Sequence, residues 1–178
     1  MAQVVTADRE SSLHEDALAG DEEAFESLIG PLVEPAIRLA FSMLGDRMEA
    51  EDATQEAITL AWRKLGQLRS GMPVRPWFLA IVVNQCRNVR RTRWFRFVRT
   101  KANVEPDRHT DLAVETIDLA RAVSRLPDRD RQALFLHFYL DLPIDEVATA
   151  LNVSAAAAKG RIYRACHRLR PSLLEEEI

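Results

Sequence analysis

The stretch Leu142-Pro-Ile-Asp-Glu-Val-Ala-Thr-Ala-Leu-Asn-Val-Ser154 decides the fold of the second half of the chain. Val147 and Leu151 lie one helical turn apart and predict a short amphipathic helix. Asn152 follows it, and asparagine tolerates the left-handed backbone of a tight turn. Ser154 then offers a side-chain oxygen that can cap a second helix. This order predicts a helix-turn-helix, in which the second helix enters the major groove of DNA.

The second helix, expected over residues 154–170, separates its side chains into stripes at about 100° per residue. The predicted core stripe consists of Ala158, Ile162, Ala165 and Leu169. A basic stripe beside it consists of Arg161, Arg164 and Arg168, with Lys159 on the far flank. The open face toward the N-terminus of the helix carries Ala156, Ala157 and Gly160. We therefore expect the cations to clamp phosphates while the small residues allow close approach to DNA.

Charge is distributed unevenly along the chain of 178 residues, whose net charge is −3. A cluster without acidic residues extends from Arg87 to Lys101 and contains Arg87, Arg90, Arg91, Arg93, Arg96, Arg99 and Lys101. Acidic residues gather at 8–26, 46–56 and 175–177. Affinity for a polyanion depends on local patches, so the net negative charge does not exclude binding to nucleic acid.

Apolar residues recur at helical spacing through most of the chain, and no convincing alternating strand is visible. Glycine and proline are sparse and are expected at segment edges, as at Gly45, where Asp46 can cap the next helix. The sequence therefore predicts an all-α fold of two small helical domains. The predicted boundaries are a flexible N-terminus at 1–12, a first domain at 13–97, a linker at 98–110 and a second domain at 111–178.

An acidic helix is predicted after Asp46. In it Asp52, Gln55 and Glu56 fall at i, i+3 and i+4 and share one face. Paired carboxylates beside an amide suit a basic groove of a partner protein, because charge steers the encounter. Trp62 is expected elsewhere, toward the core.

The chain resembles the sigma-70 family of RNA polymerase sigma factors, in its small extracytoplasmic-function (ECF) type. Leu126-Pro127 and the segments 144–154 and 158–165 are similar to region four, which reads the minus-thirty-five promoter element. The family pattern after the turn is Thr-Val-Lys-Ser-Arg-Leu, and this chain has Ala157-Ala158-Lys159-Gly160-Arg161-Ile162. The basic positions match and two hydroxyls are missing. The resemblance assigns minus-thirty-five contacts to Ser154, Ala156, Ala157, Lys159, Gly160, Arg161, Arg164 and Arg168.

The first domain resembles region two of the same family. Its Asp-x-x-Gln-Glu face, here Asp52, Gln55 and Glu56, is implied to dock on the clamp of the largest polymerase subunit. The segment from Trp77 to Asn88 and the arginines after it resemble the block that holds the melted minus-ten strand. The residues implied to contact that strand are Asn84, Arg87, Asn88, Arg90, Arg91 and Arg93, aided by the loop 68–75. An amide can pair with an extruded base edge while arginines neutralise phosphates.

The implied function is a sigma factor that recognises minus-ten and minus-thirty-five elements, without catalytic or metal-binding residues and without a cofactor. Implied partners are the clamp and flap of core RNA polymerase, promoter DNA and an anti-sigma factor. The expected location is the cytoplasm, without direct membrane insertion, because the longest apolar run, 77–83, is too short to span a bilayer.

Two alternative functions remain open. The first is a one-component regulator whose helix-turn-helix binds duplex DNA without polymerase, although it leaves the cluster from Arg87 to Lys101 unexplained. The second is a helical enzyme that uses the carboxylates of the 46–56 segment, perhaps with a metal. The sequence lacks a second cluster of metal ligands, and Cys86 and Cys166 have no C-x-x-C spacing.

Overall fold

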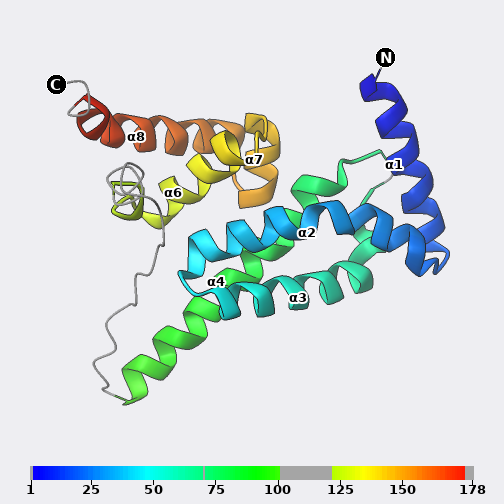
Figure 1. Ribbon diagram of the computed structural model, residues 1–178, viewed down its shortest axis with the longest axis horizontal. Helices are drawn as coiled ribbons and strands as arrows, with labels where there is room; N and C mark the ends of the chain where they lie inside the picture. Colours follow the sequence, from blue (N-terminus) through cyan, green and yellow to red (C-terminus); the bar gives the residue numbers. More distant parts are fainter. Residues whose placement is uncertain (1, 70, 101–121, 175–178) are drawn as a thin grey trace. The chain divides into compact units, whose positions relative to one another are not determined.

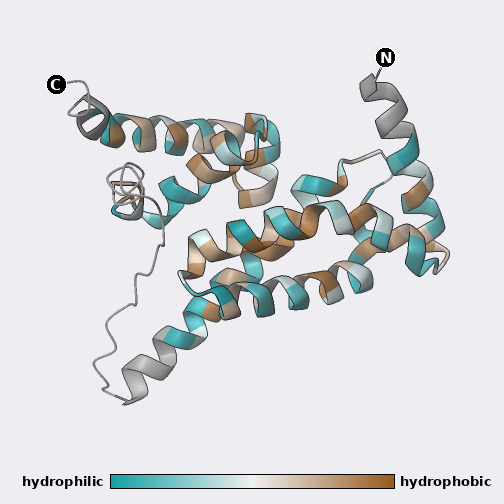
Figure 2. Cartoon of the chain, in the orientation of Figure 1, coloured by the Kyte–Doolittle hydropathy of each residue, from teal (hydrophilic) through white to brown (hydrophobic). Residues whose placement is uncertain are grey.

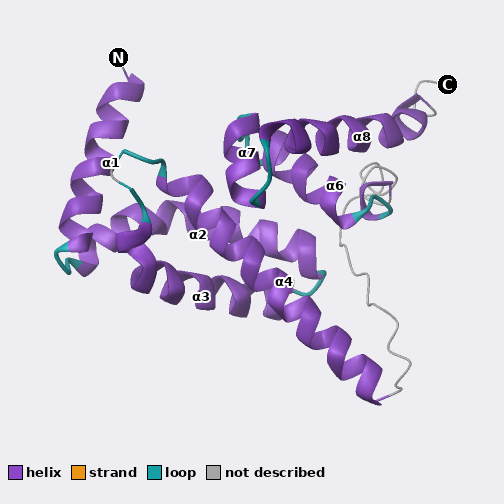
Figure 3. Ribbon diagram, turned by 180° about the vertical axis from the view of Figure 1, so that it is seen from behind, coloured by secondary structure: helices purple, strands orange, loops and turns teal. Residues whose placement is uncertain are grey.

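The computed structural model describes residues 2–69, 71–100 and 122–174, and the side chains of residues 9–69, 71–93 and 122–170. Helices joined by short turns make up this part of the chain, in which no strand occurs (Figure 3). The prediction of an all-α fold is confirmed. The chain divides into two compact units, Met1–Ala102 and Asn103–Ile178, each with buried apolar residues of its own.

The first unit is built on three long helices. Its elements are α1 (Ala2–Leu18), α2 (Glu22–Leu44), α3 (Arg47–Lys64), the 3-10 turn η1 (Leu65–Gln67) and α4 (Val74–Thr100). Helices α2, α3 and α4 pack against one another in pairs, and α1 packs against α2 (Figure 1). Hydrophobic residues alternate with hydrophilic ones along these helices (Figure 2), and Leu39, Phe78 and Val82 are fully buried in the bundle.

The boundary between α2 and α3 follows the capping pattern read from the sequence. Gly45 adopts a left-handed backbone with φ 74° and ends α2. Asp46 then accepts a hydrogen bond from the Glu49 N–H at 2.8 Å through Oδ1. The Glu49 side chain could return a hydrogen bond to the Asp46 backbone, as in a capping box. Its Oε2 lies instead 3.4 Å from Nη1 of Arg93 on α4. The predicted N-cap is confirmed, and the Glu49 side chain connects α3 to α4.

Helix α2 departs from the expectation that proline lies at segment edges, because Pro31 and Pro35 lie inside it. Each proline lacks an N–H and so removes one helical hydrogen bond. Buried apolar residues before and after the prolines, such as Leu28 and Leu39, offset this loss by packing in the core. By length and composition alone α2 would be apolar enough to cross a membrane. Its packing against α1, α3 and α4 accounts for that apolar character instead.

Helix α1 is held to the start of α4 by a contact between residues far apart in the chain. The Glu10 carboxylate accepts a hydrogen bond from the Val74 N–H at 2.6 Å, so it caps α4 from a neighbouring helix. One turn later, Nε2 of the buried His14 lies 3.4 Å from the carbonyl oxygen of Leu65. These contacts anchor α1, whose residues 2–12 are helical where the sequence predicts a flexible terminus.

The two cysteines lie in opposite environments. Cys86 is fully buried on the inner face of α4, and burial raises the pKa of its thiol from 9.0 to about 12. The thiol therefore stays protonated at neutral pH and behaves as a small apolar side chain. Cys166 is exposed.

The second unit carries the predicted helix-turn-helix. Its elements are α6 (Asp128–Leu134), the π-helical turn η3 (Phe135–Tyr139), α7 (Ile144–Leu151) and α8 (Ala155–Leu174). Pro127 and Pro143 directly precede α6 and α7, as expected for residues without a backbone donor. Both α6 and α7 pack against α8. Phe135 stacks on Tyr139 with ring centroids 4.5 Å apart, which stiffens the turn between α6 and α7.

The segment between the units is only partly described. Helix α4 continues to Thr100, past residue 98, where the linker is predicted to begin. The rest of that linker, through residue 110, and the predicted helix at 112–125 up to residue 121 lie outside the described residues. The boundaries proposed from the sequence therefore stay predictions.

We predict that Glu10→Ala lowers the free energy of unfolding by about 1 kcal/mol, the usual cost of losing a helix cap. The reason is that the Val74 N–H loses its acceptor. Thermal and chemical unfolding of the full chain measure this change. Glu15→Ala, at an exposed position of α1, is the matched control and should leave stability nearly unchanged. Equal effects of both substitutions would contradict the capping role.

Candidate nucleic-acid interface

The turn between α7 and α8 has the geometry that the sequence predicts. Asn152 adopts φ 53° and ψ 57°, the left-handed conformation, and ends α7. The Val153 N–H donates to the Ala148 carbonyl at 2.9 Å and closes the turn. Ser154 Oγ accepts a hydrogen bond from the Ala157 N–H at 3.2 Å and caps α8. Ser154 is thus engaged at the cap, with its hydroxyl hydrogen free to reach a further acceptor such as a phosphate.

The predicted core stripe of α8 is buried. It consists of Ala158, Ile162, Ala165 and Leu169. Leu126 packs with Ala165 and Leu169 in one cluster of buried residues. This burial fixes the rotation of α8 about its own axis, so the remaining positions are assigned to defined sides of the helix.

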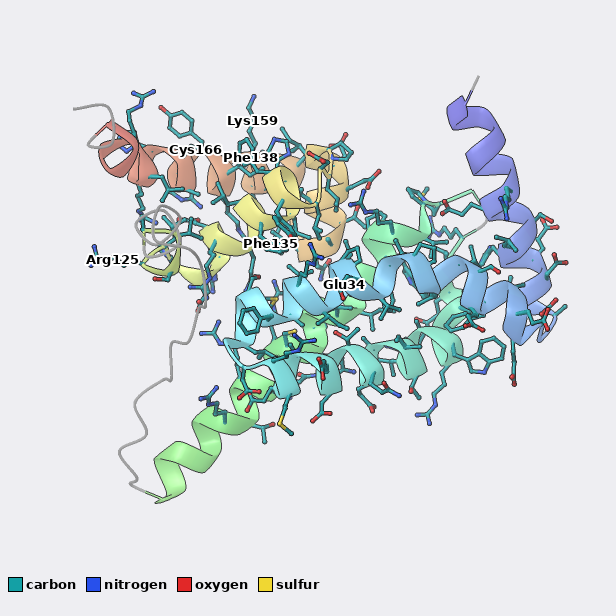
Figure 4. The ribbon with its side chains drawn as sticks, viewed as in Figure 1. Glu34, Arg125, Phe135, Phe138, Lys159 and Cys166 are labelled. Atoms are coloured by element: carbon teal, nitrogen blue, oxygen red, sulfur yellow. The ribbon has the colours of Figure 1, made fainter. Side chains whose placement is uncertain are left out.

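The side of α8 turned away from its core is polar and open. Ala156, Ala157 and Lys159 are exposed, and Lys159 projects away from α6 in Figure 4. Tyr163 is 71% exposed on this side, and the sequence analysis missed it. Its spacing of seven residues from Ala156 places it on the same face and was the available signal. With Cys166, His167 and Arg170 it lines a shallow hollow of about 280 Å³.

Two arginines of the basic stripe on α8 are paired with a buried carboxylate of α6, and the expectation that the stripe clamps phosphates stays a prediction. Arg164 Nη2 donates to Oδ1 of Asp130 at 3.3 Å, and Arg168 Nη1 donates to Oδ2 of Asp130 at 2.6 Å. Asp130 lies on α6 and is 4% exposed. No local sequence pattern marks it, because its partners lie 34 and 38 positions away. Both arginine side chains are about half exposed, so they contact solvent as well as Asp130.

Arg161 is the most enclosed cation of the stripe. Its Nη1 atom is buried without a hydrogen-bond partner. Burial lowers the pKa of its guanidinium, and the nearby positive charges of Arg129 and Arg164 lower it further, while Asp130 opposes them. An unpartnered guanidinium nitrogen among other arginines favours an anion close by, and Arg129 of α6 adds a cation that the sequence analysis did not select.

Asn84, Arg87, Asn88 and Arg91 lie along one side of α4, whereas Arg93 turns toward α3. Asn84, Asn88 and Arg91 are exposed, opposite buried Val83 and Cys86. Each amide is contacted by an arginine one turn later, with Arg87 Nη1 lying 3.4 Å from Oδ1 of Asn84. Arg91 Nη2 lies 3.5 Å from Oδ1 of Asn88 in the same way. Because each amide oxygen accepts from an arginine, the amide N–H groups are the part of each asparagine side chain that can donate to a bound base.

The other minus-ten candidates differ in their surroundings. Arg90 is exposed, and Arg93 is held to Glu49 of α3 across the bundle. The loop at 68–75 is anchored at both ends by buried residues, Leu68 and Val74. Trp77 is only partly buried. The side chains of Arg96 and Arg99, and Lys101, lie outside the described residues.

The acidic-amide face forms as predicted on α3. Asp52, Gln55 and Glu56 are exposed, while Ala53 and Ala57 are buried against the bundle. Figure 1 shows this helix along one side of the first unit, where a partner could reach it.

Trp62 is not buried as expected, since it is 38% exposed. Its ring packs edge-on against Phe25 at 5.0 Å between centroids, so one face joins the core and the rest is open. Within the described residues, no group of three or more histidine, cysteine, aspartate or glutamate side chains could hold a metal ion.

The fold and these faces define a helical DNA-binding transcription protein. Residues 28–96 match the profile of Sigma-70 region 2, and residues 116–169 match that of Sigma-70, region 4. The two profiles together span most of the chain, in the order that the family requires. The chain belongs to the sigma-70 family, and it is an RNA polymerase sigma factor of the ECF type.

Relatives support this membership over nearly the full length. The RNA polymerase sigma factor NccH of Alcaligenes xylosoxydans is 26% identical over 180 residues, covering 95% of this chain and 97% of its own. The ECF RNA polymerase sigma factor SigL of Mycobacterium tuberculosis is 27% identical over 147 residues, covering 78% of this chain and 82% of its own.

Two solved structures share the fold. The sigma factor RpoE of Bartonella quintana, solved in complex with the anti-sigma factor NepR, aligns with a TM-score of 0.70 at 21% identity, over 84% of this chain and 96% of its own. CnrH, solved with the cytosolic domain of CnrY, aligns with a TM-score of 0.71 at 22% identity, over 96% of this chain and 99% of its own.

We predict that Gly160→Ala stabilises the protein without improving promoter binding. Glycine inside a helix costs about 1 kcal/mol relative to alanine, and the added Cβ would lie 3.4 Å from Nη1 of the flexible Arg164 side chain. Because the methyl group adds no base contact, affinity should stay equal or fall. Chemical denaturation of the full chain and promoter binding of the holoenzyme measure the two effects. Tighter promoter binding would contradict a requirement for close approach at residue 160.

Proposed function

We propose that this sigma factor docks on core RNA polymerase through the exposed face of Asp52, Gln55 and Glu56. The supporting observation is that three polar groups project from one side of α3 while its small residues pack inward. A compact acidic surface complements a basic helical groove, and charge attraction speeds the encounter. The flap of the polymerase is the second contact that we propose, made by the second unit.

The outer side of α4 is proposed to hold the melted minus-ten strand. Asn84 and Asn88 lie one turn apart, so their amides can meet neighbouring unpaired bases. Arg87, Arg90 and Arg91 supply positive charge for the backbone of the strand. The ion pair between Arg93 and Glu49 reduces the charge of Arg93 toward DNA. We therefore assign Arg93 a weaker phosphate role than Arg91.

The helix-turn-helix is proposed to bind the minus-thirty-five duplex. Ala156, Ala157 and Gly160 have no side chain that can hydrogen-bond a base edge, so bidentate readout is excluded at these positions. Alanine methyl groups can still contact thymine methyl groups. Selectivity then comes largely from DNA shape and from cations held in fixed places, here Lys159 and Arg161. Single base changes in the element should cause graded losses.

In this proposal the chain itself catalyses no reaction, because the polymerase forms the phosphodiester bonds. It acts in the cytoplasm, where the polymerase works. An anti-sigma factor is the regulatory partner that we propose, since both solved relatives were captured with a partner chain. The one-component regulator is not favoured, because it gives no reason for the faces on α3 and α4.

Run-off transcription with core RNA polymerase on a genomic promoter library tests the function directly. Transcripts that begin at defined sites only when the chain is added would support it, and their upstream sequences would give both elements. Tight binding of the chain alone to duplex DNA, with no effect on the polymerase, would instead support the one-component regulator.

We predict that reversing charge at Asp52→Lys and Glu56→Lys together weakens binding to core polymerase by at least tenfold. Repulsion from a basic groove replaces attraction, while both positions are exposed and the fold should persist. Pull-down and fluorescence titration measure the affinity, and circular dichroism checks the fold. The pair Glu22→Lys and Glu26→Lys, exposed at the same spacing on α2, is the matched control. A folded double variant with unchanged affinity would exclude this face.

We predict that Lys159→Gln with Arg161→Gln flattens the salt dependence of promoter binding. Each lost phosphate contact removes about 0.9 from the slope of log affinity against log salt. Affinity should fall for most sequences alike, because phosphates carry no sequence information. A change in the preferred sequence with an unchanged slope would mean that these residues read bases.

A further inference from the structure

Asp130 is the one strongly buried carboxylate that contacts the recognition helix within the described part of the second unit. Its side chain is 5% exposed and lies between α6 and α8. Each of its oxygens accepts from a different arginine of α8, with Arg168 at 2.6 Å and Arg164 at 3.3 Å. Leaving this carboxylate buried without either arginine would strongly destabilise the fold of the second unit. Both arginines are held to Asp130 in this structure.

The guanidinium of Arg164 has a second neighbour. Its Nη1 lies 3.4 Å from the place where a Cβ of residue 160 would be, while its Nη2 contacts Asp130. The guanidinium of Arg164 therefore extends from Asp130 to Gly160. Gly160 belongs to the N-terminal half of α8, which is the half proposed to contact DNA. The Arg164 side chain is 54% exposed, so donors remain for a phosphate.

We propose that Asp130 is a positioning residue for promoter recognition, which fixes Arg164 and Arg168 against α6 so that they meet phosphates in one register only. This proposal rests on the proposed binding of α8 to the minus-thirty-five duplex. Asp130 would thus contribute to the selectivity of promoter binding without contacting DNA itself.

The charge balance explains why this arrangement favours selectivity. Arg161 lies near the charges of Arg129, Arg164 and Asp130, and Asp130 also pairs with Arg164 and Arg168. Mobile arginines can reach phosphates on any duplex, which raises binding to all sequences. Pairing with a carboxylate lowers the net positive charge of the arginine cluster. It also fixes the guanidinium groups, so they cannot move to meet the phosphates of a duplex with a different shape. Because the face of small residues reads no base directly, fixed cations are the means left to sense groove and backbone shape.

The test uses holoenzyme with the full chain. It compares binding to a promoter duplex recovered by run-off transcription with binding to a random duplex of equal length. Asp130→Asn should lower the ratio of the two affinities by at least tenfold while binding to the random duplex stays equal or rises. The slope of log affinity against log salt should steepen by up to about 0.9, because one negative charge is removed.

A second variant and a control separate geometry from charge and from folding. Asp130→Glu keeps the charge and moves the carboxylate by one methylene, so it should keep the salt slope and still lose part of the selectivity. Asp141→Asn is the control, because Asp141 is exposed in the same unit at φ 51°, a conformation that asparagine adopts readily. It should behave like the wild type.

Three results overturn the proposal. The first is wild-type selectivity in both Asp130 variants. The second is an equal loss of binding to promoter and random duplex, or an unfolded second unit with either variant, which would make Asp130 a purely structural residue. The third is a wild-type holoenzyme that does not distinguish the two duplexes, which would remove the proposed function as well. If the wild type distinguishes them and the variants do too, only the role of Asp130 fails.

Discussion

The burial of Ala158, Ile162, Ala165 and Leu169 determines what the other sides of α8 can do. Once this stripe packs against its neighbours, the rotation of the helix is fixed. One flank then meets α6 and its buried Asp130, and the opposite flank carries Lys159 into solvent. A single packing constraint thus divides one helix into a core side, an ion-paired side and an open side.

Much of the fold could be predicted, because its decisive signals are local. The left-handed Asn152, the capping oxygen of Ser154 and the stop at Gly45 each act within a few residues. Contacts made across long separations could not be predicted. Glu10 caps α4 from 64 positions away, and nothing in the surrounding sequence marks it. The same limit explains the unexpected prolines of α2, which are tolerated only because of how that helix is packed.

The candidate site divides in the same way. Helical spacing predicted that Asp52, Gln55 and Glu56, and likewise Asn84 and Asn88, share an exposed side. It could not tell which arginines are available to DNA. Arg93 and Arg168 look equivalent to Arg91 in the sequence, yet each is paired with a carboxylate of another helix. Charge counted along the chain therefore overestimates the charge that a phosphate would meet.

The contrast between the two thiols has a practical use. Cys86 is fully buried in the bundle and its thiol stays protonated, whereas Cys166 lies on the outer side of α8 beside Tyr163 and His167. A maleimide dye applied to the folded protein at neutral pH would therefore attach to the recognition helix alone. The native chain thus carries a single spectroscopic handle on α8, without any cysteine being added or removed.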